Sequence, residues 1–96
     1  MTFKEARKQA RELAKENGYW SYIYQTKNKK EKIYEISNEQ DFNSDDWWYV
    51  AKDGRIMEHK IFEKIVKKMK ESGMVSYYPF SDDVMYYGQK WNMIEK

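Results

Sequence analysis

The sequence predicts an α+β fold, namely an antiparallel β-meander of about four to six strands with two amphipathic helices. The expected order is α-β-β-β-β-α-β, with up to two further strands at the end. Two segments carry apolar residues at helical spacing, and runs rich in Tyr, Trp, Ile and Val lie between turn signals. No linker of Gly, Ser or Pro divides the 96 residues, so we expect a single compact domain over residues 1–96.

The first helix is expected from Thr2 to Asn17. Thr2 can cap the free backbone N–H groups of the first turn, and Glu5, three residues later, can reach back to complete a capping box. Gly18 can adopt the left-handed conformation that ends a helix. The predicted core stripe consists of Phe3, Ala6, Ala10, Leu13 and Ala14. One flank carries cations: Lys4, Arg7, Lys8, Arg11 and Lys15. The next sector carries acids: Glu5, Glu12 and Glu16.

Four strands are expected next, over Tyr19–Thr26, Glu31–Ser37, Trp47–Ala51 and Arg55–Met57. The first two should form a hairpin, and Asn38 to Asp46 should be a loop. The segment Lys52-Asp53-Gly54 predicts a tight turn between the last two strands, because Asp-Gly supplies the positive φ angles that short hairpins need.

The second helix is expected from His59 to Ser72, with an apolar face formed by Ile61, Phe62, Ile65, Val66 and Met69. In the tail, Met74–Tyr78 is predicted as an edge strand closed by Pro79. Val84–Tyr87 and Trp91–Ile94 are predicted as a last hairpin that turns at Gly88.

The composition argues against catalysis, and we expect no enzyme, no cofactor and no metal site. Without cysteine there is no disulfide scaffold and no thiol nucleophile, and the single His59 is expected on the solvated surface. The chain has no Gly-x-Ser-x-Gly motif and no glycine-rich phosphate loop. The carboxylate pairs Asp45-Asp46 and Asp82-Asp83 are expected to be solvated in loops. The longest apolar run, Trp47–Ala51, is far shorter than the roughly 20 residues of a membrane helix, so we expect a cytoplasmic protein without membrane contact.

Nucleic-acid binding is one of two candidate functions. The basic faces of the two helices could neutralise phosphates, with Lys4, Arg7, Lys8 and Arg11 on the first helix and Lys64, Lys67 and Lys68 on the second. The order α-β-β-β-α over about residues 2–72 resembles a double-stranded-RNA-binding domain in outline. The chain departs from that family because it lacks a Gly-Pro-x-His loop and an alanine-rich lysine pattern in the second helix.

Protein binding is the function that the sequence favours. Nine Tyr, four Trp and four Phe exceed what so small a domain can bury, since a domain of this size hides only about 60–65% of its surface. Trp47 and Trp48 alternate along one strand and cannot both face one core. The predicted docking patch consists of Asp45, Asp46, Trp47, Trp48, Tyr77 and Tyr78. A homodimer in which Trp48 is covered by its own copy would use the same patch.

In overall profile the chain is similar to the small, cysteine-free orphan proteins of bacterial phages and mobile elements. Many of those proteins inhibit host defence machinery by occluding a site, and anti-CRISPR proteins are among them. The resemblance implies an inhibitor that acts in the host cytoplasm on a larger protein partner of unknown identity.

Overall fold

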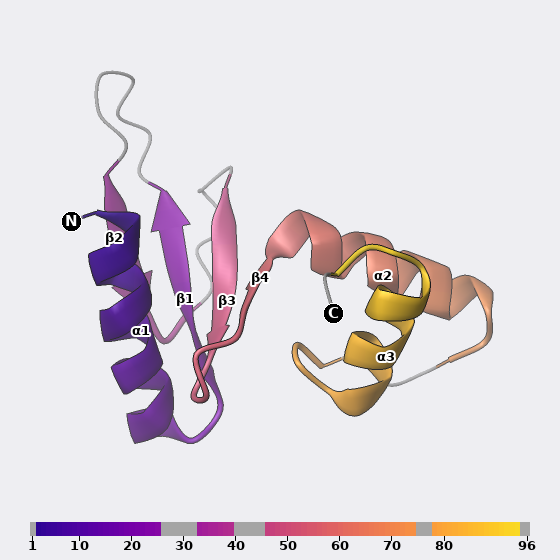
Figure 1. Cartoon of the computed structure of the whole chain (residues 1–96), viewed down its shortest axis with the longest axis horizontal. Helices are drawn as coiled ribbons and strands as arrows, with labels where there is room; N and C mark the ends of the chain where they lie inside the picture. Colours follow the sequence, from indigo (N-terminus) through magenta and orange to yellow (C-terminus); the bar gives the residue numbers. More distant parts are fainter. Residues whose placement is uncertain (1, 26–32, 40–45, 75–77, 95–96) are drawn as a thin grey trace. The chain divides into compact units, whose positions relative to one another are not determined.

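The computed structural model describes residues 2–25, 33–39, 46–74 and 78–94, and the chain divides into two compact units, Met1–Glu58 and His59–Lys96. The first unit holds helix α1 and strands β1 to β4, and the second holds helices α2 and α3 (Figure 1). Their bounds are α1 Phe3–Asn17, β1 Trp20–Gln25, β2 Tyr34–Ser37, β3 Trp47–Ala51, β4 Ile56–Glu58, α2 His59–Glu71 and α3 Asp82–Lys90. The α+β class is confirmed, and the single domain expected from the sequence stays a prediction.

Helix α1 begins and ends as its capping residues predict. The Thr2 hydroxyl accepts a hydrogen bond from the Glu5 N–H (3.2 Å), which satisfies one of the free donors of the first turn. Gly18 has a φ of +82°, and its N–H donates to the Ala14 carbonyl (2.9 Å). The predicted alanines of the core stripe are fully buried, so the helix backbone can lie close to the sheet.

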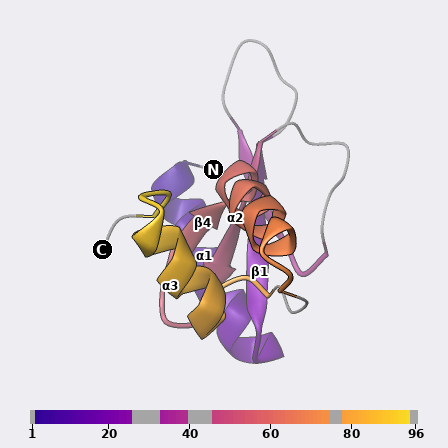
Figure 2. The same cartoon turned by 90° about the vertical axis from the view of Figure 1, so that its right-hand side faces the viewer.

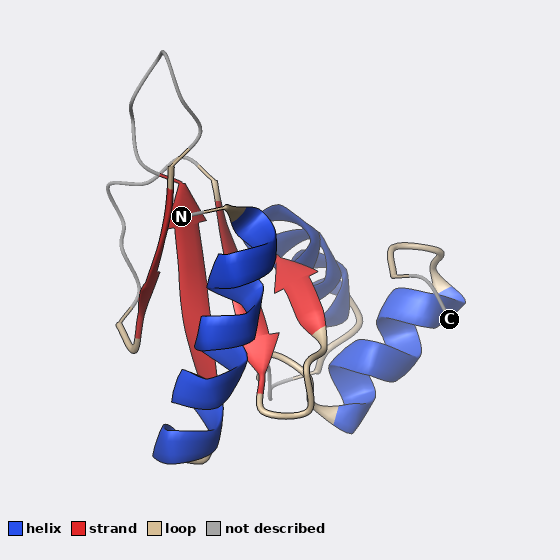
Figure 3. Ribbon diagram, turned by 60° about the vertical axis from the view of Figure 1, so that its left-hand side comes forward, coloured by secondary structure: helices blue, strands red, loops and turns tan. Residues whose placement is uncertain are grey.

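The sheet is antiparallel with the order β2-β1-β3-β4, and α1 covers one of its faces (Figure 3). The predicted meander is wrong in its order, because β3 pairs with β1 rather than with β2. Tyr22 of β1 lies opposite Tyr49 of β3 and opposite Ser37 of β2. Burial explains this order, since Ile23 of the central strand is fully buried whereas Glu35 of β2 is exposed, as suits an edge strand.

The core of the first unit lies between α1 and the sheet. Its fully buried members are Ala6 and Ala10 of α1, Ile23 of β1 and Val50 of β3. Larger, partly buried rings close one end, where Phe3 packs edge-on against Tyr34 and Trp48, with ring centroids 5.1 and 5.0 Å apart. Edge-to-face contacts of this kind favour one arrangement of the rings over others.

The opposite face of the sheet carries a second group of rings. Trp47 packs against Tyr49 and Tyr22, with centroids 4.9 and 5.7 Å apart. Trp47 is 5% exposed and Tyr49 is 7% exposed. Adjacent Trp47 and Trp48 therefore point to opposite faces, as the alternation along β3 predicts.

The turn between β3 and β4 is confirmed at Lys52-Asp53-Gly54. Gly54 has a φ of +94°, and its N–H donates to the Ala51 carbonyl (3.0 Å). The Ala51 N–H in turn donates to the Arg55 carbonyl (2.8 Å), which closes the hairpin. A side chain at Gly54 would be strained at this φ, so glycine is required here.

The second unit corrects the predicted tail, because the hairpin over Val84–Tyr87 and Trp91–Ile94 is wrong. Helix α3 covers Asp82–Lys90 and packs against α2 (Figure 2). The Ser81 hydroxyl caps α3 by accepting a hydrogen bond from the Val84 N–H (3.3 Å). Two aspartates in the first turn stabilise the helix because their negative charges lie at the positive end of the helix dipole. Gly88 is a helical residue rather than a turn. The centre of the predicted Met74–Tyr78 strand lies outside the described residues.

Two further expectations concern exposure and membranes. His59, expected on the solvated surface, is 7% exposed at the first residue of α2 and interacts within the chain. Its side chain therefore belongs to the packed interior. None of the helices in the described part of the chain is long and apolar enough to cross a membrane.

Candidate functional site

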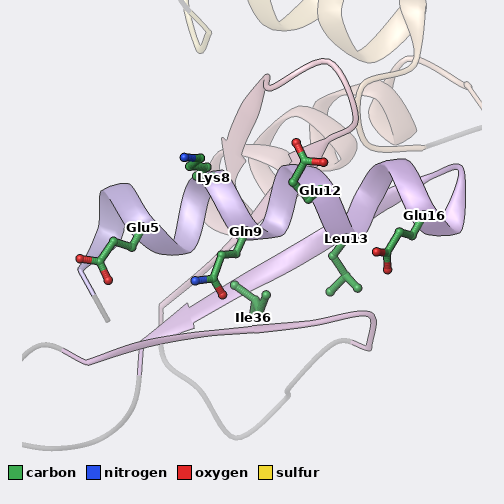
Figure 4. Close-up of a pocket in the computed structure, with 7 residues that line it drawn as sticks. All are labelled: Glu5, Lys8, Gln9, Glu12, Leu13, Glu16 and Ile36. Carbon is green, nitrogen blue, oxygen red and sulfur yellow. The ribbon is translucent and has the colours of Figure 1, made fainter.

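An open hollow of about 570 Å³ lies in the first unit, between the outer flank of α1 and the edge strand β2 (Figure 4). We call it the α1–β2 hollow. Its lining comes from two segments far apart in the sequence: six residues of one helix flank and one residue of β2. The lining residues are Glu5, Lys8, Gln9, Glu12, Leu13, Glu16 and Ile36.

The floor of the hollow is apolar. Leu13 and Ile36 are both half-buried, and Gln9 and Leu13 point from α1 toward Ile36 (Figure 4). The buried alanines of α1 bring the helix close to β1 and β2, and Leu13 and Ile36 remain only half-buried beside them. The apolar surface left between helix and edge strand is accessible to another chain.

The rim of the hollow is acidic. Glu5, Glu12 and Glu16 are exposed, and Lys8 is the one cation among the lining residues. The Glu12 carboxylate pairs with the Lys15 ammonium (3.2 Å), but both side chains are about half exposed or more, so solvent screens this pair strongly. The three carboxylates therefore remain available to a cation from outside.

The opposite flank of α1 is basic and turns toward the β3–β4 hairpin. The Arg7 guanidinium donates to the Gly54 carbonyl (3.0 Å), and the Arg11 side chain lies against the same glycine. On helix α1, Arg7 and Arg11 therefore lie on the side of the hairpin, and the three carboxylates lie on the side of the hollow together with Lys8.

Strand β2 offers a backbone edge beside the hollow. It is the terminal strand of the sheet, and in the described part of the chain its outer edge pairs with no other strand. Two contacts fix its position: the Tyr24 hydroxyl donates to the Glu35 carboxylate (2.9 Å), and the Asn17 amide donates to Asn38 (2.7 Å) at the end of the strand. The unpaired edge is therefore held in an extended conformation.

The described members of the predicted protein-binding patch belong to different surfaces of the two units. Asp46 precedes β3, and its carbonyl accepts from the Gln25 N–H (3.0 Å). Trp47 is buried on one face of the sheet, and half-buried Trp48 packs on the core on the other. Tyr78, in the second unit, is 60% exposed. The remaining two predicted residues, Asp45 and Tyr77, lie outside the described residues.

The predicted nucleic-acid-binding residues are all exposed but fall into two groups. The first group lies on α1 of the first unit: Lys4, Arg7, Lys8 and Arg11. The second group lies on α2 of the second unit: Lys64, Lys67 and Lys68. Each group therefore belongs to the surface of its own unit.

The described residues contain no group of three or more His, Asp or Glu side chains that could hold a metal ion. At Asp53, a hydrogen bond from the Arg55 backbone N–H and the nearby guanidinium lower the pKa of the carboxyl below its usual value. That contact stabilises the β3–β4 turn and does not create an acid–base pair.

Comparison with known proteins places the chain in no group: no family model matches it, and neither a curated protein nor a solved structure matches it significantly. Sequence reasoning missed Leu13 and Ile36 as neighbours in one hollow, because nothing in the sequence links a helix flank to a strand more than twenty residues away. The signal that pointed to the hollow was the sorting of acids onto one sector of α1.

Proposed function

We propose that this chain is a non-enzymatic protein-binding module that holds an extended, basic segment of a larger protein in the α1–β2 hollow. The observation that supports the proposal most is the coincidence of an apolar floor, an acidic rim and an unpaired strand edge at one place. Each of these features is suited to bind a different part of a peptide.

The strand edge is suited to bind the backbone of a peptide. An extended peptide can add a strand to an exposed sheet edge, and the main-chain hydrogen bonds then contribute affinity that does not depend on sequence. Strand β2 is suited to this because it lies at the end of the sheet and is already extended from Tyr34 to Ser37.

The helix flank determines which side chains of the peptide can bind. In an added strand every second side chain would point to the α1 side of the sheet. There it would meet the apolar floor at Leu13 and Ile36 or the rim carboxylates. A segment that alternates lysine or arginine with small apolar residues is the complement of this surface. Because the rim is exposed, its charges contribute more to the rate of encounter than to affinity.

The hollow replaces the predicted tryptophan patch as the docking surface in this proposal. A docking side chain must present its surface to the partner, whereas Trp47 is 5% exposed and Trp48 packs on the core. The inhibitor role that the sequence profile implies, occlusion of a site on a larger host protein, would use the hollow to cover a basic segment of that protein.

The test uses a fluorescently labelled peptide of alternating lysine and valine, titrated with the full chain and followed by fluorescence anisotropy at low salt. We expect saturable binding that weakens about fivefold or more for Glu16→Lys, since an exposed ion pair contributes about 0.2–1 kcal/mol and the substitution adds repulsion. Glu16 lies in the last turn of α1, where a lysine is favoured by the helix dipole, so folding is preserved.

Glu63→Lys is the matched control, because it makes the same charge change at an exposed position of α2 in the other unit. It should leave the affinity for the peptide within about twofold, because Glu63 does not line the hollow and salt screens its exposed charge. The proposal is overturned if the peptide does not bind, or if the two variants weaken binding equally.

A further inference from the structure

The second unit carries a surface that combines a row of aromatic rings with cations, and this surface shares no residue with the α1–β2 hollow. Its rings belong to α3 and the residue that follows it, and its cations to both helices of the unit. We name it the α2–α3 ring surface, formed by Lys68, Tyr86, Tyr87, Lys90 and Trp91.

The rings form a continuous row. Tyr87 lies between the other two rings, with centroids 5.0 Å from Tyr86 and 4.9 Å from Trp91. The planes of Tyr87 and Trp91 are tilted by only 33°, whereas Tyr86 stands edge-on to Tyr87 at 82°. Tyr86 is 59% exposed, and Tyr87 and Trp91 are half-buried, so each ring of the row keeps part of its surface in contact with solvent.

Cations lie over the rings at both ends of the row. The Lys68 ammonium lies 4.7 Å from the centroid of Trp91. The Lys90 ammonium lies 5.8 Å from the centroid of Tyr87 and 6.0 Å from that of Tyr86. Lys64, one helical turn before Lys68, and Lys67 are exposed on the same helix and extend the positive charge.

The packing of α3 on α2 produces this surface. A Cβ atom at Gly88 would lie 2.9 Å from Ile65 of α2 and 2.4 Å from Ile94, so the absence of a side chain lets α3 and the segment after it approach α2 closely. The acids of α3, Asp82 and Asp83, lie in its first turn, at the end of the helix remote from Trp91. The sequence alone placed these rings in a hairpin and so did not bring them beside the lysines.

We propose that the α2–α3 ring surface binds single-stranded nucleic acid, which goes beyond the protein-binding function proposed above. Bases stack on a row of exposed rings, and lysines beside the rings neutralise the phosphates between the bases. Stacking of a base on a ring contributes more than an exposed cation–π contact, so a base can displace Lys68 from Trp91 and leave its ammonium for a phosphate. A duplex keeps its bases paired and cannot use the rings.

The experiment measures binding of the full chain to fluorescein-labelled oligothymidylate by anisotropy, with a duplex of the same length as comparison. We expect single-strand binding that weakens as salt rises. For single strands, the logarithm of the binding constant falls by about 0.7 per tenfold rise in salt for each phosphate that a cation neutralises. Loss of one such contact in Lys68→Gln should therefore lower the affinity about fivefold at 0.1 M salt. Tyr86→Ala should weaken binding by about fivefold or more, while Tyr86→Phe, which keeps the ring, should bind like the unchanged chain.

Two control variants make the same changes in the first unit. Tyr19→Ala removes a tyrosine that is 72% exposed, and Lys52→Gln removes an exposed lysine of the β3–β4 turn. Both should change the affinity for oligothymidylate by less than about twofold. The proposal is overturned if the oligonucleotide does not bind at low salt, if the duplex binds as tightly, or if the controls lose as much affinity as Lys68→Gln and Tyr86→Ala.

Discussion

Substitution of Gly88 by alanine tests the packing that distinguishes the second unit from its sequence-based prediction. The added Cβ would lie 2.4 and 2.8 Å from two side-chain atoms of Ile94 and 2.9 Å from one of Ile65, all closer than real Cβ contacts. Overpacking of this kind costs about 1–3 kcal/mol, and the better helix propensity of alanine offsets about 0.8–1.0 kcal/mol. We therefore expect Gly88→Ala to lower the free energy of unfolding by up to about 2 kcal/mol.

A double-mutant cycle separates the two effects. In an Ile94→Ala background the two closest atoms are gone and only the contact with Ile65 at 2.9 Å remains, so the loss of stability caused by Gly88→Ala should be clearly smaller. Urea unfolding followed by far-UV circular dichroism measures all four chains. Gly18→Ala is the control: Gly18 has a φ of +82° and no neighbour within 4 Å, so its cost should not depend on Ile94. If Gly88→Ala lowered the free energy of unfolding equally in both backgrounds, the packing argument would be refuted and the predicted turn at Gly88 would be favoured.

Three further predictions concern the first unit. Ala10→Leu should lower the urea midpoint through overpacking of about 1–3 kcal/mol, because Ala10 is fully buried between α1 and the sheet; an unchanged midpoint would mean that α1 does not pack closely there. Thr2→Ala should cost about 0.5–2 kcal/mol in thermal melts whereas Thr2→Ser should not, and equal melts for both would argue against the cap. The pKa of Asp53 is held below its ordinary value of 3.8. The ionised carboxylate therefore stabilises the folded chain above that pH, and this stabilisation is lost as the pH falls through the pKa of the folded state. Asp53→Asn should therefore be less stable than the unchanged chain at neutral pH and converge with it in acid, and a difference that persists in acid would exclude the carboxylate as its cause.

The first unit could largely be predicted because its signals are local. Thr2 and Gly18 delimit α1, Gly54 marks the turn, and the alternation along β3 puts Trp47 and Trp48 on opposite faces. The strand order could not be predicted in the same way. Which strand pairs with β1 depends on contacts between segments far apart in the sequence, and local propensity does not contain them.

In the second unit α2 was predicted correctly, but the segment that forms α3 was predicted as a strand because its strand-forming residues outweighed a capping signal. Val84, Tyr86 and Tyr87 favour a strand, and Gly88 next to them favours a turn. Ser81 followed by two aspartates is a helix start, and it is this signal that the structure follows. The consequence reaches function, because only the helix brings Trp91 beside Lys68.

The candidate hollow was predictable only in part. The sorting of Glu5, Glu12 and Glu16 onto one sector of α1 follows from helical periodicity alone. That this sector lies beside Ile36 follows from the position of β2 at the edge of the sheet, which depends on strand order. The surplus of aromatic residues indicated protein binding, yet its most prominent pair packs in the structure: Trp47 is 5% exposed and Trp48 lies against the core.

Amide hydrogen exchange at β2, measured by NMR on the full chain with and without the lysine–valine peptide, tests the central proposal most directly. A segment that adds to the edge of the sheet forms new backbone hydrogen bonds, so exchange should slow at outward-facing amides between Tyr34 and Ser37 when the peptide saturates the chain. Saturation of the chain by the peptide with exchange at β2 unchanged would contradict the account.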